Sequence, residues 1–217
     1  MRKIAFLFLT HPMALDMHGF LIATESAFSG CEIIKEVSIE KNVYSVVYNS
    51  FDGCYGIEKI YWNSDLVTNY NDEYGSSSLF DGSYMDCDNI EVIIGDAVEK
   101  LPVRLFADMK MTLTMGKNLT EIGDSAFARC TFLNEITFPE TLVKIGAAAF
   151  SNAVLPCDII LDNTVEQIGN SAFSGATVKN IKLGRKVKSI GSQVFSSTKY
   201  DSIEIDIPDA EFIGWRA

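Results

Sequence analysis

Apolar residues recur along this chain at a fixed long interval. The motif Ile-Gly-x-x-Ala-Phe at 122–127 returns at 145–150 and at 168–173, and a variant of it ends at Phe195. By subtraction of residue numbers, the phenylalanines of these four copies are 23, 23 and 22 residues apart. A constant period between about 20 and 50 residues is typical of a solenoid, whose coils bury their apolar sides against one another. The pattern therefore predicts an elongated stack of coils without a central core.

Each repeat also has a short-range pattern that predicts its local structure. Residues 136–138 are apolar, polar and apolar, which is the period of a strand with one buried face. Pro139 ends this strand, Leu142 and Ile145 point back inward, and Gly146 permits a turn that a side chain would resist. Stacking such strands predicts a parallel ladder along one side of the coils.

Following the period toward the N-terminus predicts a column of eight aromatic residues. They are Phe28, Phe51, Tyr84, Phe106, Phe127, Phe150, Phe173 and Phe195. In the third coil Tyr84 is preferred to Phe80, because this register places Cys87 three residues after its aromatic, as in the other cysteine-bearing coils. The wide gap before Tyr84 then contains a polar, turn-rich insertion at 63–78, which is typical of a surface loop. Such a loop is either a tolerated insertion or part of a binding face.

Residues 133–150, which read LNEITFPETLVKIGAAAF, match nearly every fixed position of the repeat L-x-x-I-x-L-P-x-x-L-x-x-I-G-x-x-A-F-x-x-C. The chain thus resembles the BspA-like leucine-rich repeat family. The resemblance implies an α/β repeat fold, a leucine-rich-repeat solenoid with a parallel β-ladder and short turns or 3-10 segments on its convex side. Residues 1–20 are then expected to be an irregular N-terminal cap or the remnant of a signal peptide. Residues 21–217 are expected to form about eight coils.

At the C-terminal end of the array, two alternatives stay open. Phe212 and Trp215 either fold over the last coil or the chain has been cut from a longer array.

The family resemblance also implies a class of function. BspA-like members include bacterial surface proteins that attach to host matrix proteins or to other cells. The resemblance therefore implies a non-enzymatic protein-binding module, secreted or at the cell surface. The alternative is a structural spacer, one segment of a longer repeat array that has no specific ligand.

Composition narrows the classes of partner and of chemistry. The formal net charge of −11 disfavours nucleic acid and anionic membranes, and no apolar run approaches the roughly 18 residues that span a bilayer. The only histidines, His11 and His18, match no recognised metal pattern, and no nucleotide-binding or nucleophile motif is present. We therefore expect no enzyme, metal or cofactor. The five cysteines, an odd number, are expected to be buried and unpaired rather than a disulfide framework.

The outward side of the predicted ladder is the remaining candidate for a site. Tyr61 and Ile93 are expected on neighbouring strands, where an apolar patch would be unusual, and hot spots of protein binding favour aromatic residues. The full candidate set is Tyr61, Ile93, Lys59, Glu91, Tyr70 and Tyr74. Four acidic residues, Glu36, Glu91, Glu135 and Asp158, are expected on the same face and favour a basic partner.

Overall fold

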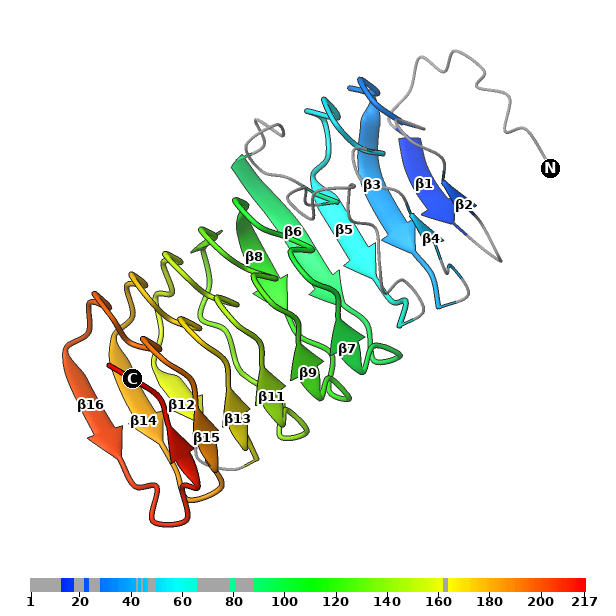
Figure 1. Cartoon of the computed structure of the whole chain (residues 1–217). Coiled ribbons are helices and arrows are strands. Elements are labelled where there is room, and N and C mark those ends of the chain that lie inside the picture. Colours follow the sequence, from blue (N-terminus) through cyan, green and yellow to red (C-terminus); the bar gives the residue numbers. More distant parts are fainter. Residues whose placement is uncertain are drawn as a thin grey trace.

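The repeat folds as a stack of coils whose strands run parallel and pair with equivalent strands one coil away (Figure 1). This computed structural model describes residues 13–17, 22–23, 28–41, 43, 45–46, 50–65, 79–80, 88–161 and 164–217. Within these residues there is no helix, so turns connect the strands of each coil. The predicted leucine-rich-repeat solenoid with a parallel β-ladder is confirmed.

One ladder runs along the N-terminal half of the molecule. Its strands, in spatial order, are β1 (Met13–Met17), β3 (Ile34–Ile39), β5 (Lys59–Trp62), β6 (Asp88–Ile94), β8 (Lys110–Thr114) and β10 (Thr131–Phe132). We call it the first ladder. Its register pairs Glu36 with Lys59, Lys59 with Glu91 and Glu91 with Thr112, as the periodicity predicts.

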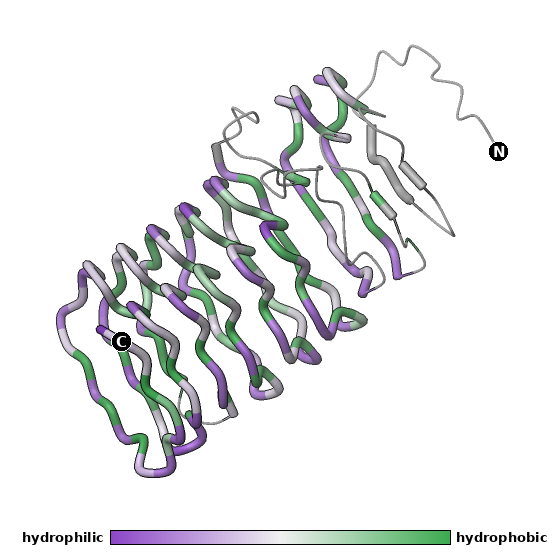
Figure 2. Tube along the Cα trace, in the orientation of Figure 1, coloured by the Kyte–Doolittle hydropathy of each residue, from purple (hydrophilic) through white to green (hydrophobic). Residues whose placement is uncertain are grey.

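Two further sets of strands complete the coils. The second ladder consists of β7 (Lys100–Leu101), β9 (Glu121–Ile122), β11 (Lys144–Ile145), β13 (Gln167–Ile168), β15 (Ser189–Ile190) and β17 (Phe212–Ile213). The third ladder consists of β12 (Ile159–Leu161), β14 (Asn180–Leu183) and β16 (Ser202–Ile205), and a short pair joins β2 (Ile22–Ala23) to β4 (Ser45–Val46). Hydrophobic residues recur at corresponding places in successive coils (Figure 2), because inward and outward positions alternate along each strand.

Phenylalanine rings stack in one unbroken column through the core. Neighbouring ring centroids lie 5.0 to 5.9 Å apart along the column Phe28, Phe51, Phe80, Phe106, Phe127, Phe150, Phe173 and Phe195. The prediction of Tyr84 as the third ring is therefore wrong, since Phe80 stacks between Phe51 and Phe106. The sequence reading assigned all the extra residues to one side of the third ring. By subtraction they lie on both sides, with spacings of 29 and 26 residues around Phe80. Tyr84 and Cys87 lie outside the described residues.

The strand expected at 136–138 is also absent from the structure. The first ladder ends at β10 and the third begins at β12, and residues 133–139 between them form no strand. The side-chain amide of Asn134 replaces the missing strand: its Oδ1 accepts the N–H of Leu113 at 2.8 Å, and its Nδ2 donates to the carbonyl of Leu113 at 3.0 Å. A polar side chain thus satisfies the edge of β8 that a backbone would otherwise pair.

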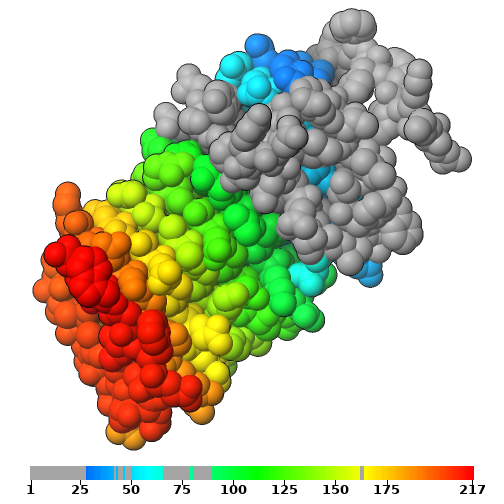
Figure 3. All heavy atoms as spheres, viewed as in Figure 1, coloured from blue at the N-terminus to red at the C-terminus, as the bar shows by residue number. Residues whose placement is uncertain are grey.

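The two ends of the described array differ from the expectations in detail. Within residues 1–20, Met13–Met17 forms β1 and pairs in parallel with β3, whereas His11 and His18 lie outside the described residues. At the other end, Phe212 is 56% exposed and Trp215 is 63% exposed. Both residues belong to the last, short coil, in which β17 pairs with β15 and the carbonyl of Trp215 accepts the N–H of Gln193 at 2.9 Å; this coil lies at the end of the elongated body in Figure 3.

Candidate functional site

The outward face of β5 and β6 brings together four of the predicted site residues. Tyr61 pairs in register with Ile93, and Lys59 pairs with Glu91. The Nζ atom of Lys59 lies 3.0 Å from Oε2 of Glu91, so these charges form an ion pair beside the apolar pair. Tyr61 and Ile93 are both half-buried, so the patch is only partly open to solvent. We call these four residues the Tyr61 patch.

Two carboxylates lie near enough to Tyr61 to act on its hydroxyl. Burial raises the pKa of the Tyr61 hydroxyl, and the negative charges of Glu40 and Asp96 raise it further, since both disfavour the phenolate. Ser38 Oγ donates a hydrogen bond to Glu40 at 2.7 Å. Lys117 Nζ lies 2.7 Å from Asp96 and holds the pKa of that carboxyl below its usual value. The Tyr61 ring therefore lies in the field of two acidic side chains that other residues position.

Other predicted features of this face are placed differently. Tyr70 and Tyr74 lie outside the described residues, which end at Asp65 on this side of the insertion. Glu135 forms an ion pair with Lys179 at 3.0 Å, so its charge, like that of Glu91, is partly compensated. Ile160 on β12 is 50% exposed, which makes it more exposed than either apolar member of the Tyr61 patch.

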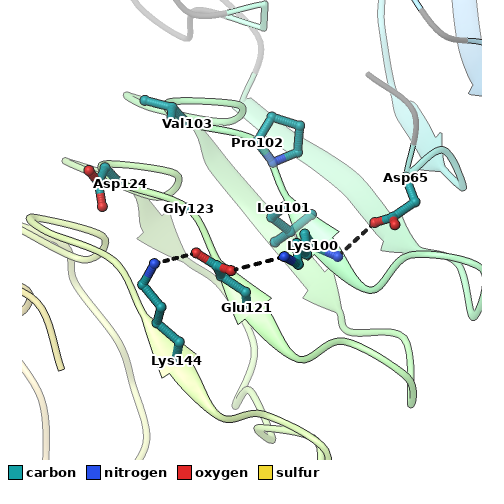
Figure 4. A pocket seen from close by; sticks show the side chains of 9 residues that line it. All are labelled: Asp65, Lys100, Leu101, Pro102, Val103, Glu121, Gly123, Asp124 and Lys144. Carbon is teal, nitrogen blue, oxygen red and sulfur yellow. Dashed lines mark hydrogen bonds and ion pairs between the residues drawn. The ribbon is translucent and has the colours of Figure 1, made fainter. Parts of the chain in front are cut away.

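A shallow pocket lies on the second ladder, where sequence reasoning placed no site (Figure 4). It has a volume of about 310 Å³ and is lined by Asp65, Lys100, Leu101, Pro102, Val103, Glu121, Gly123, Asp124 and Lys144. Glu121 lies between two lysines, with Lys144 Nζ at 2.6 Å and Lys100 Nζ at 3.6 Å. The alternation of Lys100, Glu121 and Lys144 at one repeat position was the sequence signal for this ion network. Glu121 and the two lysines thus pair with one another within the pocket.

The described residues hold few groups suited to catalysis. No group of three or more metal-ligating side chains occurs in this part of the chain. Burial raises the pKa of the Cys130 thiol to about 12, which keeps it protonated and unreactive. No helix long and apolar enough to cross a membrane occurs among the residues that the structure describes.

Comparison with protein families agrees with the fold. The model of the BspA type leucine rich repeat region matches residues 21–112 and 99–214, with six copies of the repeat. The chain belongs to this family. A search of curated proteins gave no match.

Two solved structures are similar to this BspA-type chain. The pneumococcal vaccine antigen PcpA shares 17% identity with a TM-score of 0.46, over 83% of this chain and 62% of the PcpA chain. A leucine-rich repeat protein from Bacteroides ovatus shares 16% identity with a TM-score of 0.32, over 94% of this chain and 83% of that one. This chain therefore spans less than two thirds of the PcpA chain.

Proposed function

We propose that this chain is a non-enzymatic protein-binding module, secreted or displayed at a cell surface, that contacts its partner through the Tyr61 patch. Membership of the BspA-type family supports this class of function and this location. The observation that carries the proposal is the pairing of Tyr61 with Ile93 on the outward face of a rigid ladder. Repeat proteins commonly use such preformed extended surfaces to bind other proteins.

The charges around the Tyr61 patch favour a basic partner. Glu40 and Asp96 both act on the Tyr61 hydroxyl, so a partner with a lysine or arginine at this point would gain electrostatic attraction. An arginine would also stack on the Tyr61 ring, which adds a cation–π contribution. We therefore propose a basic segment of a host matrix or other surface protein as the partner.

Binding to immobilised candidate matrix and surface proteins tests the proposal. The double variant Tyr61→Ala with Ile93→Ser removes the apolar pair, and we expect it to weaken binding at least about tenfold, as loss of a hot spot does. Ile160→Ser is the matched control, because Ile160 has an equivalent outward position on β12, far along the stack. If the folded double variant binds as tightly as the wild type while Ile160→Ser loses binding, the site lies on the third ladder.

A structural spacer is the second candidate function. This candidate is supported by ion pairs that join charged side chains of neighbouring coils. Lys144 pairs with Glu121, and Lys188 pairs with Glu166 at 2.8 Å. A surface whose charges are used internally has fewer groups for a partner. A spacer predicts that no surface protein binds above the level seen with an unrelated acidic protein.

A further inference from the structure

The strand β16 has an open edge at the end of the third ladder. It pairs with β14 on one side, and among the strands that the structure describes none lies on its other side (Figure 1). The edge of a sheet is a template for pairing with another chain. We propose that β16 binds, along this edge, an extended segment of another protein in which lysine or arginine alternates with apolar residues. The Tyr61 patch lies several coils away on β5 and β6, so the inference goes beyond the proposed function and does not rest on it.

The register shows that a further strand would cover apolar side chains of β16. Ile203 aligns with Ile181 of β14, and Ile205 aligns with Leu183. Leu183 is fully buried, whereas Ile205 is 54% exposed. The two positions differ because β14 has a strand on both sides and β16 has a strand on one side only. A segment added to β16 would therefore bury Ile205 as β16 buries Leu183, and it would continue an interface that already repeats along the stack.

Opposite charges alternate from coil to coil, and this alternation identifies the chemistry of the added segment. Inside the stack, Glu121 has Lys100 at 3.6 Å on one side and Lys144 at 2.6 Å on the other. Three exposed acidic residues in and beside β16 each have a basic residue at the neighbouring position of the preceding coil. These pairs are Asp201 with Lys179, Glu204 with Lys182 and Asp206 with Arg185. Basic residues on the open side would give these carboxylates the same two-sided arrangement that Glu121 has.

The charge of this end of the stack favours a basic segment over a second copy of the chain. Residues 199–217 contain five acidic residues but only two basic ones, Lys199 and Arg216. The guanidinium carbon of Arg216 lies 4.2 Å from the centre of the Trp215 ring, within its own coil. Two copies that met end to end would bring like charges together, which disfavours association, whereas a basic segment gains attraction.

The positions along β16 specify the sequence pattern of the segment. Successive residues of a strand point to opposite faces, so a parallel segment in register needs a basic residue opposite Glu204 and apolar residues on both sides of it. Asp201 favours another basic residue three positions earlier, and Asp206 favours one two or three positions later. The chain itself contains this pattern at 179–188, KNIKLGRKVK, which includes β14, the strand on the paired edge of β16. A synthetic peptide with the sequence of residues 179–188 is therefore a suitable probe.

Binding of this peptide to the full chain tests the proposal. Fluorescence anisotropy of the labelled peptide, titrated with the chain, measures its affinity. A second peptide of the same composition, in which the apolar residues are grouped together, has the same charge without the alternation. We expect the alternating peptide to bind at least about tenfold more tightly than the grouped one, and its binding to weaken as the ionic strength rises.

Two double variants test the role of the acidic residues. Glu204→Lys with Asp206→Lys should weaken binding of the alternating peptide at least about tenfold, because attraction becomes repulsion. Glu32→Lys with Glu140→Lys is the matched control, since it makes the same change in net charge at exposed positions in other coils. The control should bind the peptide nearly as tightly as the wild type.

Two further comparisons test the apolar contact and locate the peptide. Ile205→Ser should weaken binding, and Ile160→Ser, which changes a side chain of similar exposure on β12, should not. Tyr61→Ala with Ile93→Ser should leave peptide binding unchanged, which separates this edge from the Tyr61 patch.

Three results would overturn the proposal. If neither peptide binds, the acidic side chains only keep the edge of β16 unpaired. If the Tyr61–Ile93 variant loses binding while the Glu204–Asp206 variant keeps it, the peptide binds at the Tyr61 patch instead. If sedimentation velocity shows a dimer of the chain that Ile205→Ser dissociates, the edge belongs to a second copy.

Discussion

Phe150 lies between two rings of the phenylalanine column and shows how much one residue contributes to the stability of the fold. Its centroid is 5.4 Å from that of Phe127 and 5.3 Å from that of Phe173, and its side chain is fully buried. Replacing Phe150 with alanine leaves a cavity that coils on both sides hold open, so we expect a loss of about 3–5 kcal/mol of unfolding free energy. Urea denaturation measures it. Thr137→Ala, on the exposed surface, is the control and should change stability by less than about 0.5 kcal/mol; equal losses would contradict this register.

The turns require left-handed backbone at two places in each regular coil, and most coils have no glycine there. For example, Ala148, two residues before Phe150, has a φ of 53°, and Asn152, two residues after Phe150, has a φ of 57°. A side chain in this region is strained by roughly 1 kcal/mol, which glycine avoids. Ala148→Gly should therefore raise the unfolding free energy, measured by urea denaturation, by up to about 1 kcal/mol.

Ala149→Gly is the control for that substitution. Ala149 is fully buried and has no positive φ, so glycine there removes a packed methyl group and adds freedom to the unfolded chain. We expect it to destabilise the protein. Equal effects of the two substitutions would show that φ does not decide the outcome.

The buried thiol of Cys130 should make stability depend on pH. Its pKa rises from an ordinary 9.0 to about 12, because burial disfavours the thiolate. Above about pH 9 the unfolded chain loses this proton while the folded chain keeps it, so its stabilising contribution is full below pH 9 and is lost as the pH rises through about 12. The total loss is at most about 4 kcal/mol.

Urea midpoints at about pH 8 and about pH 10.5 measure this dependence against a variant. Cys130→Ala removes the thiol, and alanine occupies the same repeat position at 153 and 176. The variant should lose less stability than the wild type between the two pH values. If the wild type and the variant lost the same stability, the pH dependence would come from tyrosines and lysines instead.

At the scale of elements, side chains close the edges of two ladders. In regular coils two successive N–H groups share one carbonyl of the previous coil, as those of Thr120 and Glu121 share the oxygen of Glu99. At the edge strand β7, Oδ1 of Asp65 takes this place and accepts the N–H groups of Glu99 at 3.0 Å and Lys100 at 2.7 Å. Asn134 does the same for β8. Short polar side chains thus take the place of backbone hydrogen-bonding groups at these two strands.

Removing the Asn134 amide should expose the edge of β8. Asn134→Ala leaves both backbone groups of Leu113 without their partner, so we expect a loss of about 1–3 kcal/mol and faster hydrogen exchange at the Leu113 amide. Asn134→Asp keeps the acceptor and loses the donor, and its effect should be intermediate. Unchanged exchange at Leu113 in the alanine variant would contradict the role of this side chain.

The sequence predicted the elements wherever the repeat is regular, and failed where a side chain replaces backbone. The period located the strands that follow the motif, because each buried position recurs in the next coil. It placed a strand at 136–138, because Ile136, Thr137 and Phe138 have strand alternation, but alternation does not reveal that Asn134 pairs with β8. It also chose Tyr84 over Phe80, since a cysteine alignment cannot show how an insertion divides around a ring.

At the scale of the whole molecule, the position of the candidate site could be predicted from the strand register, whereas its electrostatics could not. Alternation along β5 and β6 was enough to place Tyr61 beside Ile93 on the outward face. The sequence did not show that Glu40 and Asp96 act on Tyr61, because both lie just beyond the ends of the strands, where the strand alternation no longer applies. It also treated the acidic column as open charge, whereas Glu91 and Glu135 have lysine partners.

The first and second ladders are interrupted at different coils along the stack, which affects how the rod carries a mechanical load. Where β7 begins the second ladder with Asp65 as its cap, the first ladder runs through β5, β6 and β8. Where the strands of the first ladder end at β10, Thr131 continues the column only through single bridges to Val154 and then Thr177, while the second ladder runs through β9, β11 and β13. The two interruptions are offset along the stack, so neither of them crosses both ladders of the same coil. Among the described residues, a load that stretches the rod therefore meets at least one continuous ladder at each of these two positions.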